Sequence, residues 1–513
     1  MALEYLMARL ILAKIDNVGP EAKLLLLRFA LVYGDAPLKV TARELARALG
    51  IPLNALANAT SELDAAGLLI RTPVVDGRGR PSFEYRLAGE QLAKLKEGDE
   101  SSAGDRLLWP LMECLLRESI AVAGEKTPAA SHGTAKRKAV QPSRKGAASK
   151  LSNPNRMLLL VLLALADNCG VVRARGAGEI ARWVGISGAR IHSQVEKLVA
   201  LGYIRAAVPG VAGRLLFGKV AGTVFLNLQH PTYGERGRPA GIYLFSCPLS
   251  APPRFRLREI PQLVEAAKLL PVRLELSVRM LPNSSLYDPA DLYSGGQLQV
   301  LAPLLLDGLS SRELIEFLQV KLEEYASCLL SNRWGRLCSA SVWEDLKHDE
   351  DYNLKARIVR EVVPAAVYRG ACPGLEVLER YRLLVDLIYY LAVQLADVLK
   401  QALMRTKLAP WIRGRYRFEE LTYVLLPTTD GGGQFSFTVM TYPEKAPTTS
   451  PPGFCVRPGY ALNHNPLGLE PRLSEADYSA DEKYQHGLLT RAKAQKGPTL
   501  TARPASIGWI TSI

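Results

Sequence analysis

The sequence predicts a mainly α-helical protein with small β-hairpins, built from two related units and a helical C-terminal domain. Three observations support this fold class. The segment Arg43–Arg71 recurs as Gly178–Ala206 at a constant shift of 135. The second half carries apolar residues at intervals of three and four, as in long helices. Finally, 513 residues are too many for one ordinary domain.

Net charge separates the two halves of the chain. Residues 1–250 hold 33 Lys and Arg against 21 Asp and Glu, a net charge of +12, whereas the whole chain carries +14. A basic half joined to a nearly neutral half predicts a polyanion-binding part attached to a part with another task. The longest uninterrupted apolar run, Met157–Ala166, is far shorter than the roughly 20 residues of a spanning helix, so we expect no membrane segment.

The repeat is carried by eight identical positions. They are Glu44, Ala46, Arg47, Gly50, Ile51, Leu63, Ala65 and Gly67, which correspond to Glu179, Ala181, Arg182, Gly185, Ile186, Leu198, Ala200 and Gly202. The same shift relates the apolar runs Leu24–Leu31 and Leu159–Ala166. Each copy therefore begins with an apolar helix and continues in the same order.

Each element of the repeat has a local signal. Thr41 with Glu44 three residues later predicts a capping box at the start of a short helix. Gly50 and Gly185 are placed to end that helix. Pro52 and Ser187 then begin a further helix. Its buried stripe is Leu56, Thr60 and Leu63 in the first copy, and Ile191, Val195 and Leu198 in the second. Gly67 and Gly202 end it before short β-type runs.

These residues resemble the winged helix-turn-helix family of DNA-binding domains, as found in many bacterial transcription regulators. The matching pattern is E-L-A-R-A-L-G-I-P with G-L-L-I-R, repeated as E-I-A-R-W-V-G-I-S with G-Y-I-R. The resemblance implies that the second helix of each motif lies in the major groove. It also implies that a β-hairpin wing contacts the flanking backbone or the minor groove.

Each copy also contains the tetrapeptide R-G-R-P. Arg78 and Arg80 lie within VDGRGRPSFEYRL, a turn followed by alternation typical of a strand, and Arg236 and Arg238 begin a matching run. The shift between these tetrapeptides is 158, which predicts 23 extra residues in the second hairpin and added strand in Leu215–Leu228. Arginine in a tight turn suits a narrow minor groove, so we expect all four to contact DNA.

The residues opposite the buried stripe are the candidates for base and phosphate contacts. In the second copy Arg190 suits guanine, and Ser193 and Lys197 suit phosphate or base edges. In the first copy Asn54 and Asn58 suit adenine. The remaining members of the two outward faces are Ala55 (which suits a thymine methyl), Ser61 and Glu62, and Ala189, His192 (on the flank) and Glu196. Because Glu62 stands where the second copy has Lys197, the first copy is expected to bind more weakly or to contact protein.

The segment between the copies is strongly basic. Asp105–Val122 has a helical pattern that Pro110 should kink or split. Lys126–Lys150 then contains seven Lys and Arg and no acidic residue, which predicts a flexible tether. Either non-specific phosphate binding or simple tethering would follow. In both cases the two units are expected to engage separate half-sites.

The second half predicts long helices. They are expected at Ile260–Leu281, Ser311–Leu330, Leu354–Tyr368 and Gly374–Thr406, and Arg413–Tyr442 should form a β-hairpin. The boundaries are then a first winged-helix domain at 1–95, a helix and basic linker at 96–150, and a second winged-helix domain at 151–250. A helical domain with its hairpin follows at 251–442, and a loop-rich tail at 443–513.

No catalytic motif is present, and the scattered Cys and His residues have no metal-binding spacing. We therefore expect no cofactor and no enzymatic activity. The acidic residues around His348 could suggest a nuclease, although a charged helix end is the commoner explanation.

Together these features predict a cytoplasmic, nucleoid-associated bacterial transcription regulator that binds double-stranded DNA. The helical half would serve for homo-oligomerisation or partner binding. Two alternatives remain open. One is a replication initiator or partition protein of a plasmid or mobile element, although initiators typically abut their two winged helices. The other is a winged-helix adaptor that contacts only protein.

Overall fold

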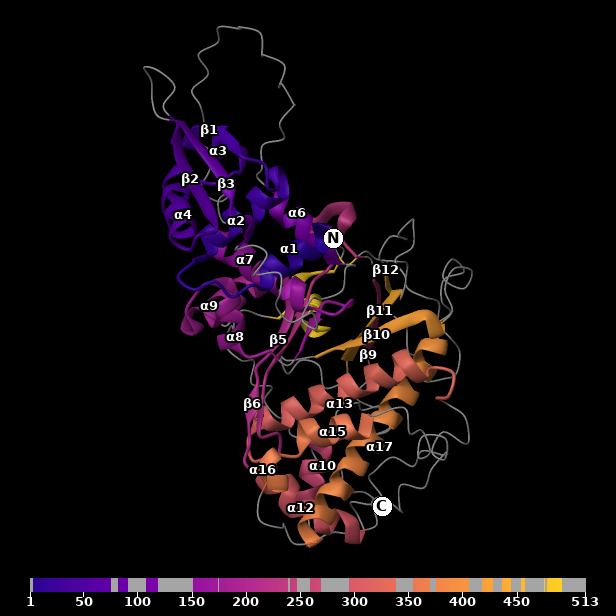
Figure 1. Cartoon of the computed structure of the whole chain (residues 1–513). Helices are drawn as coiled ribbons and strands as arrows, with labels where there is room; N and C mark the ends of the chain where they lie inside the picture. Colours follow the sequence, from indigo (N-terminus) through magenta and orange to yellow (C-terminus); the bar gives the residue numbers. More distant parts are fainter. Residues whose placement is uncertain are drawn as a thin grey trace.

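The computed structural model consists of two repeat units followed by a helical domain, with small sheets between them (Figure 1). The units occupy one end of the molecule, and helices α10 to α17 occupy the other. This confirms the predicted mainly helical class with small, mostly antiparallel sheets. The structure describes residues 3–74, 82–90, 108–118, 151–173, 175–238, 240–246, 259–268, 295–337, 354–369, 375–405, 418–427, 436–443, 454–456, 475 and 478–490.

In its described residues the first unit has helices α1 to α4 and a three-stranded sheet of order β1-β3-β2. The expected capping box is present: the Thr41 hydroxyl accepts from the Glu44 N–H at 3.2 Å, and the Glu44 carboxylate accepts from the Thr41 N–H at 2.8 Å. The elements are α1 (Leu3–Leu12), α2 (Pro20–Tyr33), β1 (Leu38–Val40), α3 (Ala42–Ala48), α4 (Leu53–Ala65), β2 (Leu69–Val74) and β3 (Ser82–Leu87).

The second unit repeats this order. Its last helix, α9, covers Gly188–Ala200, which is α4 displaced by 135 residues, as the sequence predicts. Gly185 ends the preceding helix with φ +81°, and Gly50 has φ +61° at the matching position, where glycine adopts a left-handed backbone without strain. The elements are α7 (Asn153–Leu165), β4 (Val171–Val172), α8 (Ala177–Val184), α9, β5 (Ile204–Val208), β6 (Val211–Ala212), β7 (Lys219–Val220) and β8 (Thr223–Leu226).

The hairpin of the second unit is not the one that the second R-G-R-P predicts. Leu69 pairs with Leu87, 18 positions later, and the equivalent Ile204 pairs with Leu226, 22 positions later. The second hairpin (residues 204–226) is therefore longer by four positions, so the prediction of 23 is wrong. The strand that follows Arg238, β9 (Gly241–Ser246), pairs with β11 (Ser436–Pro443) and β12 (Phe454–Val456) in another sheet.

The two units pack directly against each other, so the expectation that they move freely on a tether is also wrong. Equivalent helices α2 and α7 are in contact, and the Lys23 ammonium, 2 % exposed, donates to Ala13 O at 2.6 Å and to Trp183 O at 2.5 Å. Burial lowers the pKa of Lys23 to about 7. A helix between the units, α6 (Trp109–Arg117), contacts both α2 and α7. Pro110 lies in its first turn, where proline introduces no kink.

The helices expected at Ser311–Leu330 and Gly374–Thr406 are confirmed, but the one expected at Leu354–Tyr368 is divided in two. A helix at Gly295–Gly308 was not predicted, and the expected Ile260–Leu281 is described only as far as residue 268. The helices of this domain are α10 (Glu259–Lys268), α12 (Gly295–Gly308), α13 (Arg312–Arg333), α15 (Leu354–Val362), α16 (Ala365–Arg369) and α17 (Leu375–Arg405). In the described part of the chain, no helix is long and apolar enough to cross a bilayer.

The predicted C-terminal hairpin exists as β10 (Leu421–Leu426) and β11 (Ser436–Pro443). It belongs to a four-stranded sheet of order β10-β11-β9-β12, in which β12 (Phe454–Val456) is parallel to β9. Helix α13 packs on this sheet. The domain boundary expected after residue 250 is therefore wrong, because it would separate β9 from the strands β11 and β12 with which it pairs. Within the predicted tail, α19 (Ala480–Gln485) begins at a capping box of Ser479 and Glu482.

Candidate nucleic-acid interface

Helix α9 presents the polar face that the sequence predicts. Of the predicted inner stripe, Ile191 and Leu198 are buried in the core and Val195 is half-buried, whereas Gln194, which was not predicted, is buried. The side chains on the opposite face are exposed, namely Ala189, Arg190, His192, Ser193 and Lys197. Ser187 starts the helix, as expected. An exposed face of one arginine, one lysine and small polar residues suits contact with phosphates and base edges.

Local contacts keep this face ordered and partly balance its charge. The Ser193 hydroxyl donates to Arg190 O at 3.0 Å, so its oxygen remains available as an acceptor. His192 Nε2 lies 3.3 Å from Glu196 Oε1 one turn later. The half-buried Glu196 thus faces the histidine at the flank.

Helix α4 presents a less basic face. Asn54, Asn58 and Ser61 are exposed, and Ala55 is half-buried. Glu62 is engaged within the protein, because its Oε2 accepts from the Gly19 N–H at 2.8 Å. That contact satisfies one of the free N–H groups at the start of α2 and places a negative charge where the helix dipole favours one. Glu62 is thus a structural residue, which accounts for the charge reversal relative to Lys197.

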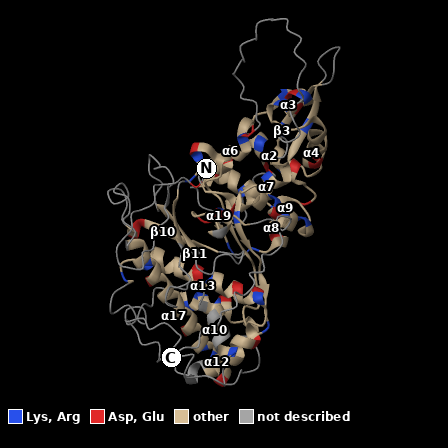
Figure 2. Cartoon of the chain, turned by 180° about the vertical axis from the view of Figure 1, so that it is seen from behind, with Lys and Arg blue, Asp and Glu red and all other residues tan. Residues whose placement is uncertain are grey.

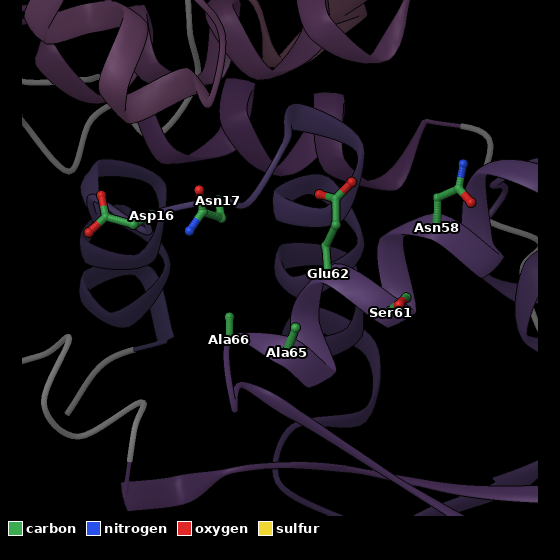
Figure 3. Close-up of a pocket in the computed structure, with 7 residues that line it drawn as sticks. All are labelled: Asp16, Asn17, Asn58, Ser61, Glu62, Ala65 and Ala66. Carbon is green, nitrogen blue, oxygen red and sulfur yellow. The ribbon is translucent and has the colours of Figure 1, made fainter.

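A pocket of about 460 Å³ opens beside this end of α4. Figure 3 shows Asp16 and Asn17 on one side and Asn58, Ser61 and Glu62 of α4 on the other. Two carboxylates here disfavour a nearby phosphate. We therefore expect any DNA contact of α4 to come from its first turns, where Asn54 and Ala55 lie, with Asn58 at the pocket rim.

The predicted wing arginines do not form a matched set. Arg78 and Arg80 lie outside the described residues, between the described strands β2 and β3. Arg236 lies in a short 3₁₀ helix (Pro231–Arg236), 3.8 Å from Glu113 of α6. Arg238 is 8 % exposed, donates to Asn168 O and, at 2.8 Å, to Pro443 O, and lies over the Tyr442 ring. Arg238 therefore joins the second unit to the C-terminal sheet, and its expected place at a wing tip is wrong.

The actual hairpin tip of the second unit is buried in the helical domain. Phe217, 3 % exposed, meets Phe317 of α13 edge to face at 5.1 Å, and its N–H donates to Val362 O at 2.7 Å. The Tyr381 hydroxyl of α17 donates to Leu215 O at 2.8 Å. Figure 1 shows the strand β6 running from the second unit toward α16 and α12. The tip of this hairpin, which carries Leu215 and Phe217, is therefore held away from any ligand that α9 contacts.

Two further basic residues belong to the candidate interface. Arg47 on α3 and Arg182 on α8 are both exposed and occupy equivalent positions in the last turn of the first motif helix. Exposed guanidinium groups suit contact with phosphates. Figure 2 shows basic and acidic residues together on α3. The signal was available in the sequence, because both arginines are among the eight identities of the repeat.

No metal centre is assembled within the described residues. There, no three His, Cys, Asp or Glu side chains gather in a way that could hold a metal ion. The acidic residues around His348 lie outside the described part of the chain. Comparison of the chain with protein-family models, with characterised proteins and with solved structures gives no match.

Proposed function

We propose that this chain binds double-stranded DNA in a sequence-specific manner and acts as a transcription regulator, with its two repeat units serving as winged helices. The main support is the exposed face of α9, which carries Arg190, Ser193 and Lys197 and repeats the position of α4 in the first unit. Helix α9 would supply most of the base contacts. Helix α4 would add weaker ones, together with the predicted wing arginines Arg78 and Arg80.

Arg190 provides the sharpest test of this function. A pool of random duplexes is selected for binding at fixed salt, and the affinity for the recovered motif is then compared with that for an unrelated duplex. Changing Arg190 to alanine should cost about 1–3 kcal/mol of binding free energy for the motif and relax the preference at one base pair. Changing it to lysine should retain general affinity but lose that preference, because lysine lacks the bidentate fork.

The control is Arg360→Ala, which removes the same charge from an exposed position on α15, far along the chain from α9. It should leave the motif and its affinity unchanged. An unchanged motif in Arg190→Ala would contradict the assignment of α9. If no motif is recovered from the pool, the chain is better explained as an adaptor that contacts only protein.

One observation favours a second candidate, a replication initiator of a plasmid or mobile element. Initiators typically abut two winged helices, and the basic segment between the copies argued against them in the sequence. The direct contact of α2 with α7 removes that objection. An initiator should bind iterated sites and make neighbouring A·T-rich DNA reactive to single-strand probes on a supercoiled plasmid. A regulator should bind near a promoter and leave the adjacent duplex unreactive.

A further inference from the structure

One short segment of the first unit contacts both α4 and the turn that leads from α8 into α9. Glu62, near the end of α4, bonds the Gly19 N–H at 2.8 Å. On the other side, Gly185, just before α9, comes so close that a Cβ placed on it would lie 2.4 Å from Val18 O. The end of α4 and the α8–α9 turn of the second unit therefore pack against the same two residues, Val18 and Gly19.

Buried cations make this junction rigid. Lys23 of α2 bonds main-chain carbonyls on both sides, those of Ala13 and Trp183. Arg28, also of α2, donates to Leu49 O at 2.7 Å and to Leu116 O of α6 at 2.9 Å. Moving the units apart would break the bond from Lys23 to Trp183 and expose the buried faces of α2 and α7 to water. The units therefore behave as one body.

The two helices also lie on the same side of this body. α4 and α9 are at one lateral edge of the molecule in Figure 1 and again in the reverse view of Figure 2. The pocket that holds Asp16 and Glu62 adjoins the junction between them. Its carboxylates would leave the DNA opposite the pocket without a phosphate contact.

From this geometry we infer that the two units bind one continuous duplex as a rigid pair, reading two short segments at a single permitted spacing. The inference rests on the proposed DNA binding. It differs from the arrangement that a flexible tether would allow, in which each unit follows its own half-site. Duplex DNA turns once in about 10–10.5 base pairs, or about 34 Å. If the second DNA segment is rotated by half a turn or displaced by a full turn, a rigid pair of units cannot reach it while the first unit stays bound.

The test varies the spacing within the motif recovered by selection. Inserting five or ten base pairs between its two segments should reduce the affinity of the wild-type protein to that for a duplex with only one segment. A tethered pair would lose affinity with five added base pairs and recover it with ten. Recovery with ten, or a motif with only one segment, would overturn the rigid pair and leave DNA binding intact. Failure to recover any motif would instead overturn the proposed function, and the rigid pair with it.

Two glycines with the same backbone conformation distinguish an effect at the junction from the effect of backbone strain alone. Gly185→Ala places a methyl group against the Val18 carbonyl, whereas Gly202→Ala places it no closer than 3.7 Å to the His230 ring. Both positions have nearly the same left-handed backbone, with φ +81° and +82°. Gly185→Ala should weaken binding at the native spacing while preserving affinity for one segment. The quantity to compare is the affinity for the native two-segment site divided by the affinity for a single segment. Gly202→Ala should leave this ratio unchanged, and equal ratios in the two variants would contradict the role of the junction.

Discussion

Replacing Phe217 by alanine is expected to destabilise the protein by about 3–5 kcal/mol, the usual cost of removing a large aromatic side chain from a packed site. Phe217 is buried at the hairpin tip against Phe317, and its neighbour Leu216 is fully buried beside Gly308. The alanine would leave a cavity between the second unit and the helical domain. Urea unfolding followed by tryptophan fluorescence would measure the loss, since Trp183 and Trp334 lie on either side of that interface.

The matched control for this change is Leu215→Ala, two positions away in the same tip. The Leu215 side chain is 38 % exposed, and the bond to Tyr381 uses its main-chain carbonyl, which the substitution retains. Its cost should stay below about 1 kcal/mol. Equal losses in the two variants would show that the tip is not anchored through Phe217.

The second large effect is expected at Glu324, at the centre of an ion-pair cluster between the second unit and the helical domain. The cluster consists of Asp167, Arg173, Lys321, Glu324, Arg357 and Glu361. Glu324 is 8 % exposed, and its carboxylate lies 3.0 Å from Lys321 Nζ and 2.6 Å from Arg173 Nε. Glu324→Gln keeps the shape but leaves three cations with too little opposing charge. Breaking a buried pair in this way should cost about 3–5 kcal/mol.

An exposed pair on the same helix supplies the control. Glu316 accepts from Arg312 at 2.8 Å, and both side chains are exposed to solvent. Glu316→Gln should change the free energy of unfolding by about 0.5 kcal/mol or less, because exposed pairs contribute little. If Glu324→Gln is equally mild, the cluster does not hold the two parts together.

Glu324 also predicts a pH dependence. Burial by itself would raise the pKa of this carboxyl, but Lys321, Arg173 and Arg357 outweigh burial and lower the pKa to about 2. The unfolded carboxyl, with a pKa near 4.5, binds its proton first as the pH falls. The stabilisation is therefore complete above pH 4.5 and is lost between about pH 4.5 and pH 2. Glu324→Gln should remove this part of the acid sensitivity, measured as the difference in unfolding free energy from wild type.

The hairpin tip and the ion-pair cluster have a common consequence. Both connect the second unit to α13 and α15, while Lys23 and Arg28 connect the first unit to the second or to α6. The second unit is thus held between the first unit and the helical domain. The first strand of the hairpin, β5, also contacts α9.

Signals local in the chain were enough to predict the short elements and the exposed face of α9. Thr41 with Glu44, and Gly185 with Ser187, act within a few residues of the chain, so their effects can be read without knowing the fold. The repeat adds a second copy of each signal, and the stripe of Ile191 and Leu198 fixes which side of α9 faces solvent. The outer residues of α9 were therefore predictable, although on the inner side Gln194 is more deeply buried than the predicted Val195.

Strand pairing and packing between the units were decided only by the tertiary structure. β8 and β9 are both β-type runs after the repeated helix, and hydrogen bonding between distant strands is not encoded in their spacing. The tetrapeptide match therefore assigned Arg238 to a wing, although it lies against Tyr442. One clue to unit packing was present in α2, where Leu24 to Leu27 are apolar on every side and all four are fully buried. A helix that is apolar all round must be covered on both faces, but only the fold shows that α7 covers it.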